Sequence, residues 1–236
     1  MWGRRADHLG FRVLLGPDGV PGSDLTTLYA APRPSWLRVN MVTTVDGAAA
    51  GEGGRSGSIN NQVDKVVFDH LRETADVIVV GAGTARAEQY GAADRPIVVV
   101  SRRAEVPETL RAAPAGSVLM ATCSSAEGLA SARSLLGEES VLVLGSHRVD
   151  LAALRSALAE RGWTHVLAEG GPHLLHALVT GGVADELCLT IVPLLVAGEH
   201  PRMMQGPPVG VPLRPTLLLE SQGTLLGRWE IGASQE

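Results

Sequence analysis

Short runs of apolar, largely β-branched residues alternate along the chain with stretches in which apolar residues recur at helical spacing. From residue 37 to 101 the order is LRVNMVTTV, NNQVDKVVFDHLRETA, DVIVVG, TARAEQYG and PIVVVS. Val63, Val67 and Leu71 lie on one face of a helix, and Asn61 with Asp64 three residues later is typical of a helix start. The pattern predicts alternating strands and helices.

The second half of the chain continues this alternation. Its segments are SVLMAT, VLVLG, DLAALRSALAERG, THVLAEGG, PHLLHALVTGG and ADELCLTIVP, with Asp150 as an expected N-cap and Gly162 as a helix stop. DVIVV, PIVVV, VLVL and THVLA are almost continuously apolar, as in parallel strands covered on both faces by helices. TLLLESQGTLLGRWEIG predicts a closing hairpin that turns at Gln222-Gly223. The expected fold is α/β, with a mostly parallel central sheet flanked by helices and ending in an antiparallel hairpin.

The first 34 residues differ from the rest. They are rich in Gly, Pro and Arg and end in APRPS, which interrupts any regular pattern. We interpret residues 1–34 as an N-terminal arm and residues 35–236 as one domain. The chain has 236 residues, of which 45% are hydrophobic, enough for a substantial core.

Composition excludes several classes of function. A formal charge of −5 without a basic stripe argues against nucleic acid as a partner. No apolar run reaches the roughly 18 residues of a membrane span, and the start of the chain does not resemble a secretion signal, so we expect a cytoplasmic protein. Cys123 and Cys188 form no C-x-x-C pair and the seven histidines are scattered. We therefore expect no metal site, and two small buried cysteines.

Glycines follow three of the expected strands. Gly81 and Gly83 follow DVIVV, the final glycine of VLVLG follows the second strand, and Gly170 and Gly171 follow HVLA. The carboxyl edge of a parallel sheet binds ligands, and glycines there allow a nucleotide to approach the backbone. Gly81-Ala82-Gly83-Thr84 lacks the third glycine of a full nucleotide-binding fingerprint, so plain strand-to-helix turns are an equal alternative.

Polar residues at the same strand ends suggest chemistry. Ser101 and Arg102 directly follow PIVVV, where a guanidinium can bind a phosphate monoester such as the 2′-phosphate of NADPH; a solvated arginine is the simpler alternative. Glu169 precedes the Gly170-Gly171 pair and is either a buried, partnered carboxylate or an exposed loop residue. Asp46-Gly47 directly follows LRVNMVTTV and is either a tight turn or a place where the Asp46 carboxylate is held for catalysis. His173 and His176 are expected to be exposed or hydrogen-bonded rather than catalytic.

Taken together, residues 36 to 232 resemble the pyrimidine reductase family of riboflavin biosynthesis, which has a dihydrofolate reductase-like fold. The matching segments are VNMVTTVDG, LRETADVIVVGAGTARAE, PIVVVSRR, LAEGGPHLL and ADELCLTIVPLLVAG, in this order. TLYAAPRPSWLRVN further resembles the stand-alone actinobacterial members. The chain differs from bifunctional members where it has AEQYGA in place of an Asp-Asp-Pro-x-Leu-Thr run, and where Asn40 replaces a frequent Lys. The cysteine signature of their deaminase module is absent.

This resemblance implies a function. NADPH is expected to reduce the ribosyl group of 5-amino-6-(5-phosphoribosylamino)uracil to the ribityl form. By the same resemblance Asp46 is the candidate acid, base or substrate-orienting group, with a pKa that a closed apolar cleft would raise. Asn40 and Glu169 are expected to face the substrate. The residues expected to line the cofactor are Gly81, Gly83, Thr84, Ser101, Arg102, Gly170 and Gly171.

Two other functions remain open. Reduction of dihydrofolate or another pterin would use the same cofactor and cleft. A non-catalytic, NADPH-binding regulatory protein would keep the fold without turnover. The resemblance also suggests a homodimer, either through LCLTIVPLLVAG or with that segment buried as a strand within one subunit. The loop AAAGEGGRSG suits mobility over a cleft or simple surface slack.

Overall fold

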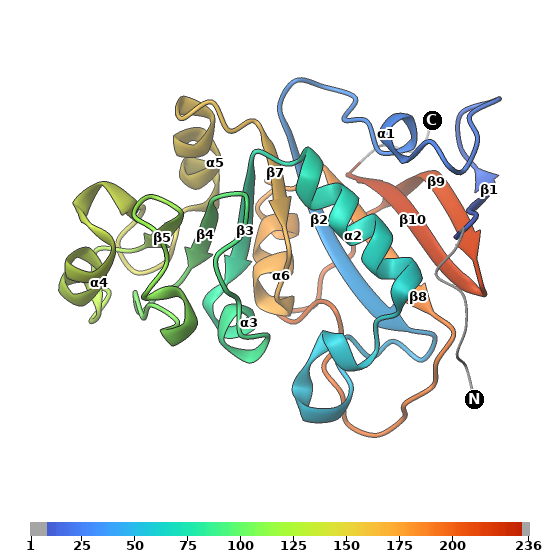
Figure 1. Ribbon diagram of the computed structural model, residues 1–236. Helices are drawn as coiled ribbons and strands as arrows, with labels where there is room; N and C mark the ends of the chain where they lie inside the picture. Colours follow the sequence, from blue (N-terminus) through green and yellow to red (C-terminus); the bar gives the residue numbers. More distant parts are fainter. Residues whose placement is uncertain (1–8, 233–236) are drawn as a thin grey trace.

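A ten-stranded mixed sheet crosses the whole molecule in the computed structural model, which describes residues 9–232 (Figure 1). The strand order is β1-β9-β10-β8-β2-β7-β3-β4-β5-β6. The strands are β1 (Arg12–Leu15), β2 (Trp36–Thr44), β3 (Val77–Gly81), β4 (Ile97–Val100), β5 (Val118–Thr122), β6 (Val141–Val143), β7 (His165–Ala168), β8 (Glu186–Val192), β9 (Leu213–Ser221) and β10 (Thr224–Ile231).

The strands from β8 to β6 in this order are parallel to one another, as the continuous apolar runs predict. β9 and β10 then form the expected antiparallel hairpin. Its two turn residues, Gln222 and Gly223, have φ angles of 51° and 79°, the left-handed conformation that a two-residue hairpin turn requires. The predicted α/β fold with a closing hairpin is confirmed.

Helices cover both faces of the sheet. α5 and α6 pack with one face in a core that includes Val39, Val79 and Ala168. On the other face, α2 packs over the β7-to-β9 half of the sheet, and α3 and α4 pack over β3, β4 and β5 (Figure 1). The helices are α1 (Leu25–Leu28), α2 (Gln62–Thr74), α3 (Ala82–Ala87), α4 (Leu129–Leu136), α5 (Leu151–Glu160) and α6 (Pro172–Thr180), with 3-10 turns at Glu52–Gly54, Ser56–Ser58, Glu108–Leu110 and Glu138–Ser140.

The helix signals expected from the sequence have the expected geometry. The side chain of Asn61 caps α2 by accepting a hydrogen bond from the N–H of Asp64 at 3.0 Å. Asp150 caps α5 in the same way, through the N–H of Ala153 at 2.9 Å. α5 ends at Glu160, and Gly162 follows with a φ of 78°.

The segment before β2 contributes to the same sheet. β1 pairs antiparallel with β9 at one edge, and Leu28 of α1 packs in the core beneath α2. The division into an arm (1–34) and a domain (35–236) stays a prediction, and residues 1–8 and 233–236 lie outside the described residues. Both cysteines are buried, as expected. Among the described helices, none has the length and apolar character needed to cross a membrane.

A buried ion cluster fastens α1 to the sheet. Glu186 is fully buried in β8 and lies between Arg38 of β2, at 2.6 Å, and Arg228 of β10. Arg38 also donates to the backbone carbonyl of Tyr29 at 2.8 Å, and Arg228 to that of Ala30 at 3.1 Å. The three charges therefore tie the residues after α1 to three neighbouring strands.

Candidate active site

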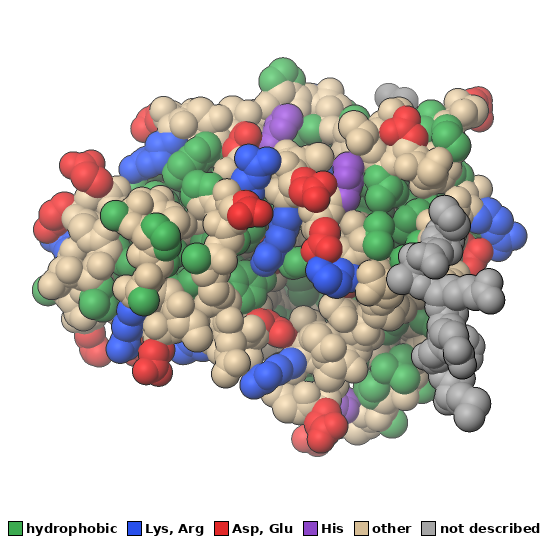
Figure 2. Space-filling view, viewed as in Figure 1, with side chains coloured by type: hydrophobic (Ala, Val, Ile, Leu, Met, Phe, Trp, Pro, Cys, Tyr) green, Lys and Arg blue, Asp and Glu red, His purple; other side chains and the backbone are tan. Residues whose placement is uncertain are grey.

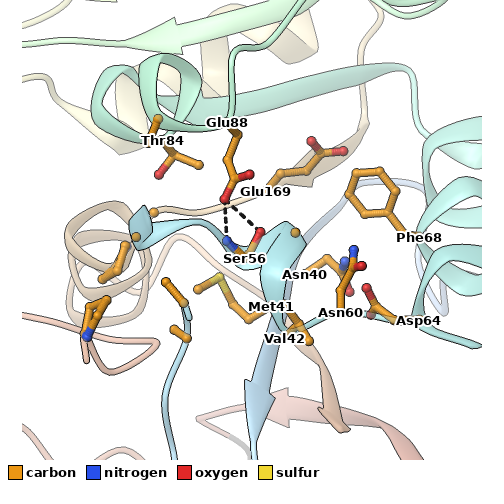
Figure 3. Close-up of a pocket in the computed structure, with 18 of the residues that line it drawn as sticks. Asn40, Met41, Val42, Ser56, Asn60, Asp64, Phe68, Thr84, Glu88 and Glu169 are labelled. Atoms are coloured by element: carbon orange, nitrogen blue, oxygen red, sulfur yellow. Dashed lines mark hydrogen bonds between the residues drawn. The ribbon is translucent and has the colours of Figure 1, made fainter. Parts of the chain in front are cut away.

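A cavity of about 280 Å³ opens where β2, β7 and β3 approach their carboxyl ends. In the space-filling view, this face of the molecule is hollowed below α2 (Figure 2). The walls come from β2, the 49–60 loop, α2, the α3 segment and the turn after β7 (Figure 3). The polar side chains in the lining belong to Asn40, Ser56, Asn60, Asp64, Arg72, Thr84, Glu88, Tyr90 and Glu169.

Glu169 forms the most densely bonded part of this wall. It follows β7 directly, and its N–H donates to the carbonyl of Val79 at 2.9 Å, which fixes it against β3. Arg72 binds its carboxylate with both arms of the guanidinium, Nε to Oε1 at 2.6 Å and Nη2 to Oε2 at 2.7 Å. Tyr90 donates its hydroxyl to Oε2 at 2.6 Å. Of the two alternatives for Glu169, the structure shows the buried and partnered carboxylate, 8% exposed.

These contacts determine the charge states of the partners. Burial opposes the charge of Arg72, yet hydrogen bonding to Glu169 raises the pKa of the guanidinium overall. Burial, together with the neighbouring Glu169 carboxylate, raises the pKa of Tyr90. The wall therefore presents a permanent cation and a neutral phenol around one carboxylate.

Asp64 is a second carboxylate in the lining. It lies in the first turn of α2 and is 4% exposed. Burial raises the pKa of Asp64, and a hydrogen bond from Thr190 acts in the opposite direction. In Figure 3, its carboxyl group lies beside the amides of Asn40 and Asn60.

Glu88 connects α3 to the loop that covers the cavity. Its carboxylate accepts hydrogen bonds from the N–H of Ser56 at 2.6 Å and from the Ser56 hydroxyl at 2.9 Å (Figure 3). Glu88 belongs to AEQYGA, the segment in which this chain differs from bifunctional members of the resembling family. Glu88 therefore fastens the 49–60 loop, which lines the cavity, to the end of α3.

Two of the predicted glycine turns meet at the edge of the cavity. The N–H of Gly81 donates to the carbonyl of Gly170 at 2.8 Å. A β-carbon at Gly171 would lie 2.2 Å from Oγ1 of Thr84, so the contact between the two turns requires glycine there. Gly170 has a φ of 83°, and a β-carbon at Gly83 would meet no atom within 4 Å. Thr84 and Gly171 line the cavity, and Gly83 faces open space beside it.

Ser101 and Arg102 lie at the end of the next strand. Val100, the last residue of β4, pairs with Gly81 in the parallel register, so both residues emerge beside the glycine turn. Ser101 is buried and accepts a hydrogen bond from the N–H of Arg103 at 3.3 Å. Arg102 is exposed and does not line the cavity.

Asp46 lies apart from the other candidates. It is exposed, lies beyond the end of β2, and belongs to a smaller neighbouring pocket with Gly47. Its carboxylate accepts hydrogen bonds from the hydroxyl of Thr44 and from the N–H groups of Val196 at 3.1 Å and Ala197 at 2.8 Å. The Thr44 hydroxyl, followed by the Ala197 N–H, holds the pKa of Asp46 below its usual range. The raised pKa expected for Asp46 is therefore wrong, because the residue is solvated and surrounded by donors rather than enclosed by apolar groups.

Four cavity residues with ionisable side chains were not singled out as site residues from the sequence: Asp64, Arg72, Glu88 and Tyr90. Asp64 occupies a position where an acidic residue is explained by helix capping alone, and Arg72 follows the apolar stripe of α2 as an ordinary surface residue would. Glu88 and Tyr90 follow α3 in a segment without regular pattern. One signal was available: if Glu169 is buried, which was one of its two alternatives, it needs a cationic partner, and α2 supplies this partner through Arg72.

The histidines of α6 behave as the sequence analysis expects. His173 is exposed and its ring bonds to the carbonyl of Gln205 at 3.0 Å, while His176 bonds to that of Pro207 at 2.8 Å. Neither lines the cavity. They hold the 200–210 segment to α6.

Comparison with known proteins assigns the chain to a family. The profile of the RibD C-terminal domain matches residues 35–224. The chain belongs to this family. The match covers β2 to the start of β10, and therefore every residue that lines the cavity, so the resemblance found in the sequence is confirmed.

The matching relatives include two pyrimidinone phosphate reductases and a riboflavin biosynthesis protein. The 2,5-diamino-6-ribosylamino-4(3H)-pyrimidinone 5′-phosphate reductase of Archaeoglobus fulgidus is 27% identical over 192 residues, which are 74% of this chain and 87% of that protein. The enzyme of the same name from Methanothermobacter thermautotrophicus is 29% identical over 182 residues, 73% of this chain and 83% of that protein. RibD of Bacillus amyloliquefaciens is 26% identical over 183 residues, which are only 49% of its length.

Solved structures show the same fold. A pyrimidine reductase-like protein from Corynebacterium diphtheriae superposes with a TM-score of 0.76 at 22% identity, covering 89% of this chain and 98% of that one. The riboflavin biosynthesis reductase Rib7 of Saccharomyces cerevisiae gives 0.63 at 14% identity, covering 86% and 92%.

Proposed function

We propose that this chain is an NADPH-dependent reductase that converts the ribosyl group of a ribosylaminopyrimidine 5′-phosphate to the ribityl form in riboflavin biosynthesis. The observation that carries the proposal is the position of the cavity. It joins the polar wall around Glu169 to the glycine turns at the carboxyl edge of a parallel sheet, the edge at which such sheets bind nucleotides. Membership of the RibD C-terminal domain family supports the same activity.

The residues at the glycine turns fit a dinucleotide. Gly83 is exposed and a β-carbon there would meet no atom within 4 Å, which leaves the backbone open to a phosphate group. The hydroxyl of Thr84 lines the adjoining cavity, and the exposed guanidinium of Arg102 lies at the end of the neighbouring strand, where it would hold a 2′-phosphate. When bound, the nicotinamide cofactor supplies the hydride.

The cavity wall would hold and orient the pyrimidine. Three hydrogen bonds fix the Glu169 carboxylate, and a carboxylate offers about four acceptor positions, so one remains for the substrate. Asn40 adds an amide that both donates and accepts. Because Glu169 is held by Arg72 and Tyr90, it is a rigid acceptor suited to positioning a substrate.

Asp46 remains a candidate, and its surroundings favour a positioning role over proton transfer. It fastens the end of β2 to the residues after β8 through Val196 and Ala197. A lowered pKa keeps it ionised at neutral pH, which is unfavourable for a general acid. Its influence on the substrate would pass through the position of β2, which carries Asn40.

The proposal is tested by following NADPH oxidation with three substrates in parallel. These are 2,5-diamino-6-ribosylamino-4(3H)-pyrimidinone 5′-phosphate, 5-amino-6-(5-phosphoribosylamino)uracil and dihydrofolate. Oxidation with a ribosylaminopyrimidine, and a ribityl product identified by mass spectrometry, is the expected result. Oxidation with dihydrofolate alone would replace the proposal with a pterin reductase, and NADPH binding without turnover of any substrate would favour a regulatory protein.

The cofactor assignment has its own measurement. Arg102→Ala is expected to weaken NADPH binding by about 10- to 100-fold, the range for one lost ionic hydrogen bond, and to leave NADH binding unchanged. Arg103→Ala is the matched control, because Arg103 is the next residue and points into solvent with 77% of its side chain exposed. Equal losses for both nucleotides in Arg102→Ala would contradict a role for Arg102 at the 2′-phosphate.

A further inference from the structure

Asp64 is a buried carboxylate that faces the cavity without a cationic partner. It is 4% exposed, and no arginine, lysine or histidine in the described part of the chain forms an ion pair with it. By contrast, the other two fully enclosed carboxylates, Glu169 and Glu186, each bind at least one arginine. Thr190 is the polar neighbour that stabilises its charged form in part.

Such a residue lowers the stability of the folded protein. Burying a carboxylate without a matching cation or several hydrogen bonds opposes folding, and the raised pKa of Asp64 reflects this. The N-cap role of Asn61 uses only the backbone N–H of Asp64, so capping does not require the acid. A ligand that brings its own N–H donors would provide the missing partner.

The surroundings of Asp64 fit a flat ring. Phe68 lies one helical turn further along α2 and also lines the cavity, with the guanidinium of Arg72 stacked at 4.5 Å from its ring. Asn40 and Asn60 flank the carboxylate (Figure 3). A planar heterocycle against Phe68 would therefore present its polar edge to one carboxylate and two amides.

We propose that Asp64 is the specificity residue that recognises the 2-amino-4-oxopyrimidine edge of the substrate, and that this enzyme acts on a ring that still carries its 2-amino group. The N3–H and the 2-amino group of that edge are parallel donors, which match the two oxygens of a carboxylate. In a uracil ring, a 2-carbonyl replaces the amino group. Its oxygen, an acceptor, would then face an oxygen of the Asp64 carboxylate, which is also an acceptor. This inference rests on the proposed function and adds the choice of substrate ring.

The same edge occurs in two kinds of molecule. A 2,5-diamino-6-ribosylamino-pyrimidinone phosphate carries it, and so does a pterin such as dihydrofolate. A uracil, from which the 2-amino group has been removed, does not carry it. If the proposal holds, reduction precedes removal of that amino group, and a deaminase must act on the reduced product.

Asp64→Asn is the discriminating variant, because an amide has the same shape but one donor and one acceptor. Wild type is expected to reduce the diaminopyrimidinone phosphate with a kcat/KM at least about 10-fold above that for the uracil, from one mismatched hydrogen bond. In Asp64→Asn, kcat/KM for the diaminopyrimidinone should fall by about 10- to 100-fold. The value for the uracil should stay constant or rise, since an amide complements its N–H and carbonyl. Asp69→Asn removes a carboxylate from the outer side of the same helix, where Asp69 pairs with Lys65, and serves as the control.

Calorimetric binding of both pyrimidines without NADPH gives a second readout that needs no turnover. The wild-type preference for the diaminopyrimidinone should appear there and disappear in Asp64→Asn. Wild-type preference for the uracil, or equal losses for both rings in Asp64→Asn, would overturn the inference and leave the reductase function standing. Turnover of dihydrofolate without turnover of either pyrimidine would overturn the proposed function. If Asp64→Asn then lost the turnover of dihydrofolate, that loss would still support recognition of the shared edge.

Discussion

At the scale of single residues, the cavity contains side chains that lower the stability of the folded protein and that we propose bind the substrate. Asp64 shows this most directly. The pKa of Asp64 is higher in the folded than in the unfolded protein. The free energy of unfolding therefore falls as the pH rises from the unfolded-state pKa to the folded-state pKa, and the destabilisation is complete above the folded-state pKa. Asp64→Asn is therefore expected to melt at the same or a higher temperature than wild type at pH about 7, and to lose this advantage near pH about 4. Thermal unfolding at both pH values checks this, and a variant destabilised at neutral pH would mean that the carboxylate has a folding partner.

Tyr90 tests the wall around Glu169. Tyr90→Phe removes the hydroxyl that donates to Oε2 at 2.6 Å and leaves the two bonds from Arg72. We expect the free energy of unfolding to fall by about 1.5–3 kcal/mol, the range for a hydrogen bond to a charged group, and KM for the pyrimidine to rise. Tyr29→Phe is the control, since Arg38 uses the backbone carbonyl of Tyr29 rather than its hydroxyl. Urea titration and steady-state kinetics measure both effects, and equal behaviour of the two variants would refute the proposed rigidity of Glu169.

Asp46 offers a choice between two roles. If it positions β2, Asp46→Asn should lower kcat by less than about 10-fold and leave the shape of the pH–rate profile unchanged, because an amide oxygen in the place of Oδ2 still accepts from the N–H groups of Val196 and Ala197. If it transfers a proton, the loss should approach the 10²- to 10⁴-fold range typical of a missing general acid or base, and one limb of the profile should disappear. Its contacts with Thr44, Val196 and Ala197 lead us to expect the first outcome.

The sequence was informative about single residues only where a residue type has few structural uses. Gly170 and Gly171 could be singled out as candidates because glycine has few structural uses, and in the structure a left-handed φ and close packing against Thr84 require it. Arg72 and Asp64 were missed because helix surfaces and helix starts routinely carry such residues for reasons unrelated to ligands. Their place in the cavity lining depends on strands that the fold brings beside α2, which no local pattern records.

At the scale of elements, the apolar runs predicted the parallel strands well, and the turn at Gln222-Gly223 was sufficient to place the hairpin. The arm was harder to interpret. Glycine and proline dominate its composition, yet Arg12–Leu15 joins the sheet as an edge strand because β9 offers it a partner. The attachment of α1 depends on Arg38, Glu186 and Arg228, which are distant in sequence.

This ion cluster predicts a strong and local effect of mutation. Glu186→Gln would leave two buried guanidinium groups without their shared carboxylate, and breaking a buried pair typically costs about 3–5 kcal/mol. Arg38 and Arg228 hold the pKa of Glu186 below its usual range against the effect of burial. Its contribution to stability is therefore present above the unfolded pKa and is lost as the pH falls through the folded one.

Urea denaturation and limited proteolysis measure the two parts of this prediction. Glu186→Gln should lower the urea midpoint and speed cleavage near residues 28–30, whose carbonyls the two arginines bind. Glu220→Gln is the control, since its partner Arg12 is 71% exposed and a surface pair contributes little. If Glu186→Gln were as stable as wild type, the attraction between the three charges would be cancelled by the free-energy cost of removing them from water.

At the scale of the whole molecule, β8 and the residues after it separate the two alternatives for LCLTIVPLLVAG. β8 lies inside the sheet between β10 and β2, so the strand belongs to the core of one subunit. Leu194 and Leu195 follow it and are 40% and 72% exposed, close to Val45 at 63%, which donates to the carbonyl of Leu194. An apolar surface of this kind is typical of a protein interface. The homodimer remains a prediction, and within LCLTIVPLLVAG only the exposed residues after β8 are available for its interface.

A second apolar surface competes for that role. Leu14 and Leu15 of β1 and Leu213 of β9 are also exposed, and among residues 9–232 β1 is the outermost strand at that edge of the sheet. Leu195→Glu and Leu14→Glu introduce the same charge on the two surfaces, and light scattering after size exclusion gives the mass of each variant. We expect a dimeric wild type, a monomeric Leu195→Glu and a dimeric Leu14→Glu, because Val45 and Asp46 tie the Leu194–Ala197 loop to the end of β2. Reduced activity in the monomer would show that dimer contacts help to hold that strand, and Asn40 with it, in place. A dimer that survives Leu195→Glu but not Leu14→Glu would transfer the interface to the sheet edge, far from the cavity.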